Sequence, residues 1–206
     1  MLKFLIKDGL VFLVNQIGAM VLTTSNNLYL ANFQGAAVVG IYNIGLKLTT
    51  LLLIPVDASM PYLLPSINDA ISKNDVSWLK KILLKYLKVL TLYSILVFML
   101  ISFFGEFLLH LWLNKEHILN QTELFSFGIF TGFFVYVYYV SYIMLSSKFI
   151  FFKFKIYPVS VLIATTIKYF SVQKYSIEGV LYTQSIALTI FFIIPSFLKL
   201  KQSKYL

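Results

Sequence analysis

The chain has 206 residues, of which 59% are apolar and only 12% are charged. A soluble domain is about 45–50% apolar and about 25% charged, so this composition excludes a soluble globular enzyme. The net charge of +9 comes from 17 basic against 8 acidic residues, and in so apolar a chain it indicates the membrane rather than nucleic acid as the partner.

Several kinds of chemistry are also excluded. The chain has no cysteine, which removes disulfides, thiolate metal sites and cysteine nucleophiles. The two histidines, His110 and His117, have no ligand-spaced partners, and there is no phosphate-binding loop, carboxylate pair or nucleophile–base pair. We therefore expect no enzymatic activity, no metal and no cofactor.

Six stretches are long and apolar enough to cross a bilayer, which needs about 20 such residues per helix. They predict an all-α integral membrane protein with one six-helix domain over residues 1–206 and no cleaved signal peptide. The predicted spans are about 9–33, 36–60, 89–113, 124–147, 156–173 and 177–198.

The orientation follows from the lysines, because cytoplasmic loops retain positive charge. Most of the 17 basic residues fall on one side if both termini are cytoplasmic, whereas only Lys115 and Lys174 then lie outside. The lysines of the inner side are Lys3, Lys7, Lys73, Lys80, Lys81, Lys85, Lys88, Lys148, Lys153, Lys155, Lys199, Lys201 and Lys204.

The first span carries a polar stripe. At 100° per residue, Asn15 and Asn26 lie about 20° apart, and Gln16, Thr23 and Asn27 form a row beside them. Polar side chains at membrane depth need partners or an aqueous cavity. Two interpretations stay open: hydrogen bonds that hold helices together, or a polar surface for a ligand.

The second span repeats this pattern with Asn43, Lys47, Thr50 and Asp57 on one face. Lys47 lies about 16 Å along the helix, near the midplane, and Asp57 lies about 15 Å further, too far to neutralise it. An unpaired ammonium there costs at least about 2.5–3.5 kcal/mol, which favours a functional role. The two stripes together predict an electropositive, water-accessible cavity for an anion.

We also expect Pro55 to kink the second predicted span.

A cytoplasmic amphipathic helix is predicted at about 76–88, capped by Asp75 and lying in the membrane interface. Its lysines, Lys81, Lys85 and Lys88, share one face. They either capture an anionic lipid head group or serve only as a topological anchor.

The stretch from Gly9 to Lys88 resembles the opening of the second half of bacterial polysaccharide (O-antigen) flippases, members of the multidrug/oligosaccharidyl-lipid/polysaccharide exporter superfamily. The resemblance is carried by "TTSNNLYLANFQG", by Gly40-Ile41-Tyr42 followed by Lys47, and by Met60-Pro61 through Pro65 before "WLKKILLKYLK". Members of the family commonly carry an acidic residue where this chain has Asn26 and Asn27, which puts cation coupling there in doubt.

The resemblance implies that this chain is one lobe of a two-lobe transporter, the C-terminal six-helix half. It implies the flipping of a polyprenyl-diphosphate-linked oligosaccharide across the bacterial inner membrane, with membrane lipids and either a second six-helix half or a second copy as partners. Lys47 would neutralise the diphosphate or an acidic sugar, while the Asn, Gln and Thr side chains would bind sugar hydroxyls.

Two other functions remain open. A cation-coupled multidrug exporter of the same superfamily would use Asp57 as its coupling residue. A membrane scaffold or gene remnant without transport activity would use none of the polar side chains.

Overall fold

The computed structural model describes residues 2–115 and 117–204, with the side chains of residues 2–8 and 11 left aside. These residues are helical with no strand among them, which confirms the predicted all-α class. The elements are α1 (Leu2–Gln34), α2 (Ala36–Ser72), α3 (Val76–Leu113), α4 (Gln121–Ile143), α5 (Ile150–Leu188), the π-helical turn η1 (Thr189–Ile193) and α6 (Ile194–Gln202).

Four helical segments of the described chain are long and apolar enough to cross a membrane: α2, α3, α4 and the continuous run Ile150–Gln202. Large apolar side chains cover much of the outer surface, as at Leu111 and Phe103, which are 73% and 68% exposed. A surface of this kind is stable only when lipid covers it, so the fold supports a membrane protein.

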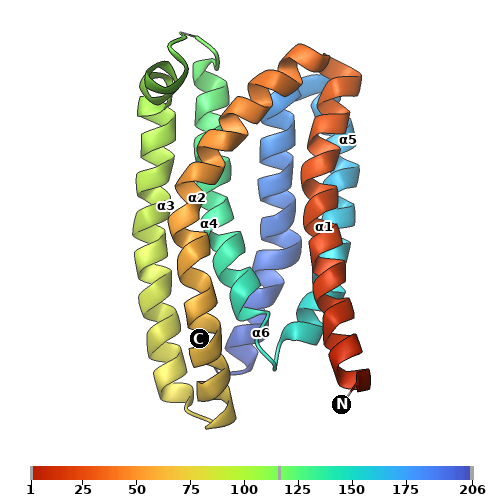
Figure 1. The fold of residues 1–206 in the computed structure, drawn as a ribbon, viewed down its shortest axis with the longest axis vertical. Coiled ribbons are helices and arrows are strands. Elements are labelled where there is room, and N and C mark those ends of the chain that lie inside the picture. The colour runs from red at the N-terminus through yellow and green to blue at the C-terminus, as the bar shows by residue number, and fades with distance from the viewer. Residues whose placement is uncertain (1, 116, 205–206) are drawn as a thin grey trace.

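The helices form an elongated bundle (Figure 1). Helix α3 packs mainly on α4, α1 packs on α5, and α2 packs on α4. The lower end in Figure 1 holds both termini, the α2–α3 turn and the α4–α5 turn, whereas the upper end holds the α1–α2 turn and the α3–α4 loop. We use lower and upper in this sense below.

Helix α5 is two antiparallel segments that meet at Ser176, whose φ of 51° and ψ of −128° break the helix. Across this reversal Thr183 Oγ1 donates to Ser171 Oγ over 2.8 Å, and Ser171 Oγ donates to the Gly179 carbonyl over 3.0 Å. Ser176 falls in the gap predicted between the stretches 156–173 and 177–198, where the chain turns back at the upper end (Figure 1).

Helices α2 and α3 are longer than predicted. With 37 and 38 residues they measure about 55 Å each, well beyond a bilayer core of about 30 Å. Their turn reaches the lowest point of the bundle (Figure 1). Helix α2 continues through Pro55, Pro61 and Pro65 to Ser72, twelve residues beyond the end of the predicted span at 60.

The amphipathic segment predicted at 76–88 is helical, but it is the first part of α3 rather than a separate interfacial helix. The physical reason is continuity, since no glycine or proline interrupts the chain between Val76 and Val89. Lys81, Lys85 and Lys88 are exposed on this extension.

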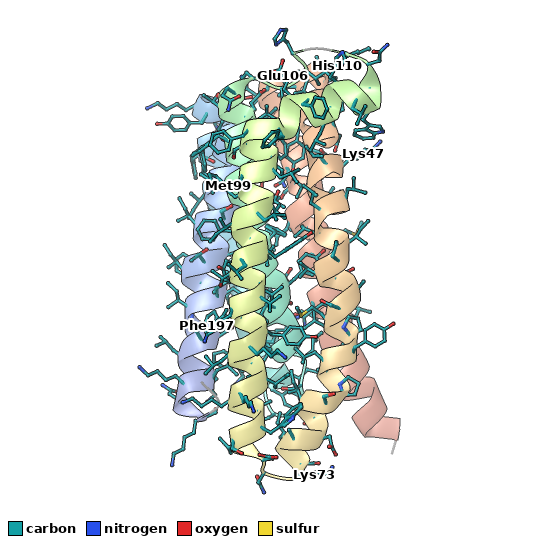
Figure 2. All side chains as sticks on the ribbon, turned by 90° about the vertical axis from the view of Figure 1, so that its left-hand side faces the viewer. Lys47, Lys73, Met99, Glu106, His110 and Phe197 are labelled. Atoms are coloured by element: carbon teal, nitrogen blue, oxygen red, sulfur yellow. The ribbon has the colours of Figure 1, made fainter. Side chains whose placement is uncertain are left out.

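Lysines gather at the lower end, where Figure 2 shows Lys73, whereas Glu106 and His110 lie at the upper end. Lys148 and Lys155 belong to the lower α4–α5 connection and the start of α5, and Lys199 and Lys201 to α6. The inner-side lysines Lys3 and Lys7 lie outside the residues whose side chains are described.

The predicted cap of α3 is present, because the Asp75 side chain accepts hydrogen bonds from the Trp78 backbone N–H at 3.0 Å and the Ser77 hydroxyl at 2.9 Å. These bonds hold the pKa of the Asp75 carboxyl below its ordinary value. The cap therefore contributes stability above that ordinary value, and the contribution is lost as the pH falls through the lowered pKa.

We expect Asp75→Ala to lower the midpoint of thermal unfolding at pH 6 and to have a smaller effect at a pH below the lowered pKa, where the wild-type carboxyl is protonated. Asp75→Asn is the control, because asparagine caps helices about as well and does not titrate. An equal loss for Asp75→Ala at both pH values would contradict a role for the carboxylate.

Candidate functional site

A polar cleft runs between α1 and α2, with α4 and both segments of α5 behind it. It contains two cavities, a lower one of about 450 Å³ and an upper one of about 440 Å³. Four residues line both cavities and form what we call the waist of the cleft: Thr23, Phe134, Tyr138 and Gln184. Each cavity has a volume in the range of small-molecule binding sites.

Most of the predicted site residues line this cleft. Asn15, Gln16 and Asp57 line the lower cavity. Asn26, Asn43, Lys47 and Thr50 line the upper cavity. Asn27 lines neither cavity, although its Oδ1 atom is buried without a hydrogen-bond partner among the described residues.

The side chains of the stripe differ in what they bond to. Asn26 is buried and donates through Nδ2 to the Tyr42 hydroxyl at 2.7 Å and to Gln184 Oε1 at 3.1 Å, so it holds helices together. The Thr50 hydroxyl donates to the Leu46 carbonyl of its own helix. Gln16 and Asn43 have no hydrogen bond to the described residues, which leaves their amides to water or a ligand.

Lys47 is exposed on the upper part of α2, as Figure 2 shows. Among the described residues the ion pairs are Lys73 with Asp69 and Glu106 with His117, and Lys47 belongs to neither. It therefore presents an uncompensated ammonium to the upper cavity. Asp57 lies in the other cavity, in agreement with the prediction that it cannot neutralise Lys47.

The lower cavity has its own lysine. Lys153, only 4% exposed, donates to the Ser141 hydroxyl at 2.6 Å and the Ser141 carbonyl at 3.2 Å, and its Nζ lies 5.7 Å from the centre of the Tyr157 ring. Asp57 Oδ1, in the same cavity, accepts from the Tyr142 hydroxyl at 3.0 Å. The lower cavity thus offers a cation and an anion on different walls.

A third lysine, Lys168, is completely buried behind the waist. Its Nζ donates to the Leu22 carbonyl and Ser25 Oγ, each at 3.0 Å, to Gln184 Oε1 at 3.2 Å and to Asn26 Oδ1. All four acceptors are neutral, and they come from α1 and the returning segment of α5. Lys168 therefore connects three helical segments through one ammonium.

Lys153 and Lys168 are not among the predicted site residues: Lys153 is one of the predicted inner-side lysines, and Lys168 falls within the span predicted at 156–173. The helix begins at Ile150 rather than near 156, and this places Lys153 inside the bundle. A signal was available, because Lys153, Tyr157, Ala164 and Lys168 lie within about 60° of one face at 100° per residue, and all four are buried.

The cleft suits a ligand with several oxygen atoms and negative charge. Its walls present amide groups, hydroxyls and two lysines, of which Lys47 is exposed and Lys153 is largely buried. The described residues contain no group of three or more His, Cys, Asp and Glu side chains that would hold a metal ion.

No protein-family model, curated protein or solved structure matches this chain. What the cleft does is therefore inferred from its own residues.

Proposed function

We propose that this chain is one six-helix lobe of a transporter that flips a polyprenyl-diphosphate-linked oligosaccharide across the bacterial inner membrane. The observation that carries the proposal is the two-cavity polar cleft with a lysine in each cavity, Lys153 below and Lys47 above. A soluble anion-binding protein would not need the apolar outer surface that surrounds this cleft.

The six crossings consist of α1, α2, α3, α4 and the two segments of α5, the second of which continues through η1 and α6. Helix α1 joins the set despite its polar stripe, because that stripe faces the cleft rather than lipid. Both termini then lie on one side of the membrane. The lysines of the lower end favour the cytoplasm for this side.

In this proposal the two ends of the cleft serve successive stages of transport. The anionic head group meets Lys153 at the lower, cytoplasmic end and Lys47 at the upper end, so a positive charge is available in both cavities. Sugar hydroxyls exchange their bonds to water for bonds to the amides of Gln16 and Asn43. The polyprenyl tail stays in the surrounding lipid.

A transporter of this kind needs a second lobe. Lobes related by an axis along the membrane normal have the same orientation, so a second six-helix half or a second copy of this chain would pair with it in parallel. The two lobes would rock about the substrate to expose it to either side in turn.

The test replaces Lys47 by glutamine and, separately, by alanine in cells that depend on this protein for surface polysaccharide. We expect both variants to reduce the polysaccharide about tenfold, because a tenfold change needs only about 1.4 kcal/mol and each variant removes a charge that meets the head group. Lys80→Gln, which removes an exposed lysine on α3 away from the cleft, is the control. Undiminished polysaccharide in both Lys47 variants would contradict charge neutralisation by Lys47.

A cation-coupled drug exporter is the second candidate, and one observation favours it. Asp57 faces the lower cavity beside Tyr138 and Tyr142, and a carboxylate among aromatic rings suits an organic cation. In that case Asp57→Asn should abolish drug resistance and leave surface polysaccharide unchanged. The lysine in each cavity favours the anionic substrate.

A further inference from the structure

Lys168 is the most anomalous charge in the described chain. It is completely buried and lies at membrane depth if α5 spans the bilayer. A charge in such a place is retained only with partners or a function, and the acceptors around this one are all uncharged.

The hydrogen bonds indicate which form of the amine is present. Four oxygen atoms converge on Nζ, and an ammonium has three protons to offer them. A neutral amine would need a donor for its lone pair, and the one hydroxyl among these oxygens, that of Ser25, already donates to the Leu22 carbonyl at 3.1 Å. The pocket is therefore built for the charged form.

This ammonium also orients the two amides beside it. The oxygen atoms of Asn26 and Gln184 both point at Lys168, and Gln184 Oε1 also accepts from Asn26. With its oxygen fixed on that side, the Gln184 amide directs its Nε2 protons away from Lys168. Gln184 is buried but lines both cavities, and its Nε2 donates to none of the described residues, so this group is the part of the amide left for a ligand at the waist of the cleft.

We propose that Lys168 is a positioning residue that creates a diphosphate subsite at the waist, where the Gln184 amide donates to the anion and the buried ammonium behind it supplies the positive field. The subsite rests on the proposed function, which brings a lipid diphosphate into the cleft, and it is the position at which the diphosphate binds during transport. The field of a buried charge is weakly screened, so it acts through Gln184 without touching the ligand. Lys153, Lys47 and this subsite then form a series of three positive positions along the cleft.

The experiment compares binding of a polyprenyl diphosphate and of the matching polyprenol to the full chain in detergent. Lys168→Met keeps an unbranched side chain of similar length but removes the charge, and Lys168→Arg keeps the charge. We expect Lys168→Met to weaken diphosphate binding about tenfold while polyprenol binding changes less than about twofold. Lys168→Arg should retain most of the preference for the diphosphate, and Lys174→Met, at an exposed lysine near the reversal, should match the wild type.

Gln184→Leu provides an independent variant, because it removes the amide donor and leaves the lysine. It should reduce the preference for the diphosphate in the same direction, and it decides the matter if Lys168→Met does not fold. If Lys168→Met loses affinity for both lipids equally, Lys168 has only a role in packing and the inference is overturned. An unchanged preference for the diphosphate over the polyprenol, in folded Lys168→Met or folded Gln184→Leu, would also overturn it.

Two further measurements, competition by inorganic pyrophosphate and transport of the lipid by the paired lobes, show which of the two proposals is wrong if one of them is. Inorganic pyrophosphate should compete with the lipid for the subsite; if it binds as tightly as the lipid, the ligand is the free anion and the lipid is overturned as its source. If the wild type prefers the diphosphate but moves no lipid when paired with its second lobe, the proposed function is wrong and the subsite is retained. If the wild type moves lipid and the Lys168→Met variant still prefers the diphosphate to the polyprenol, only the subsite is wrong.

Discussion

Gly179→Ala should destabilise the protein by about 2–3 kcal/mol and lower the midpoint of thermal unfolding by about 4–12 °C. A Cβ atom at this position would lie 2.6 Å from the Ser171 carbonyl oxygen and 2.9 Å from its carbonyl carbon. Backbone atoms cannot move aside as the end of a side chain can, so the two segments of α5 must separate. The separation would also loosen the contact between Lys168 and Gln184, which lies on the same pair of segments.

Gly40→Ala is the matched control, since a Cβ there has no heavy atom within 4 Å. Alanine is favoured over glycine inside a helix by about 0.5–1 kcal/mol, so this variant should be neutral or slightly more stable. Thermal unfolding of both variants in detergent checks the prediction. A Gly179→Ala protein with the wild-type midpoint would mean that the segments do not pack as closely as described.

Cysteines introduced along the cleft should react with a membrane-impermeant maleimide at least about tenfold faster than a cysteine on the lipid-facing surface. The reason is that the reactive thiolate forms only where the thiol is in contact with water. The chain has no cysteine of its own, so each variant carries a single reactive thiol. Gln16→Cys reports on the lower cavity and Asn43→Cys on the upper cavity.

Leu162→Cys is the control for this contrast. Leu162 is 64% exposed, lies midway along the first segment of α5 and lines neither cavity of the cleft. Lipid should cover it in a membrane, whereas in denaturant all three thiols should react alike. Equal slow labelling at the three positions in membranes would mean that the cleft is filled with lipid rather than water.

The helical architecture could be predicted from apolar stretches alone, because a bilayer sets the minimum length of a crossing helix. Helix ends were less predictable. Helix α2 continues beyond the predicted span as an amphipathic helix, and nothing in the hydropathy of residues 61–72 distinguishes a helix from a loop. The break at Ser176 was visible only as a short gap between two apolar stretches, since no glycine or proline occupies that position.

The site was predictable where residues lie close together in the sequence. The stripes on α1 and α2 follow from helical periodicity, and both line the cleft. The partners of Lys168 could not be recognised in this way, because Asn26 lies 142 residues earlier and Gln184 lies across the reversal of α5. The same contacts show why Asn26 serves packing while Asn43, seventeen positions further along, remains available to a ligand.

In the proposed function, the cleft between α1 and α2 holds a lipid-linked diphosphate. The most direct measurement is the rate at which the Asn43→Cys and Gln16→Cys variants react with the maleimide in proteoliposomes, with and without a polyprenyl-diphosphate-linked oligosaccharide. We expect this lipid to slow labelling at both positions, the matching polyprenol to leave it unchanged, and Leu162→Cys to be unaffected by either. The labelling rates in the cleft could instead be the same with the diphosphate lipid, with the polyprenol and with neither. That result would contradict binding of the diphosphate lipid in the cleft.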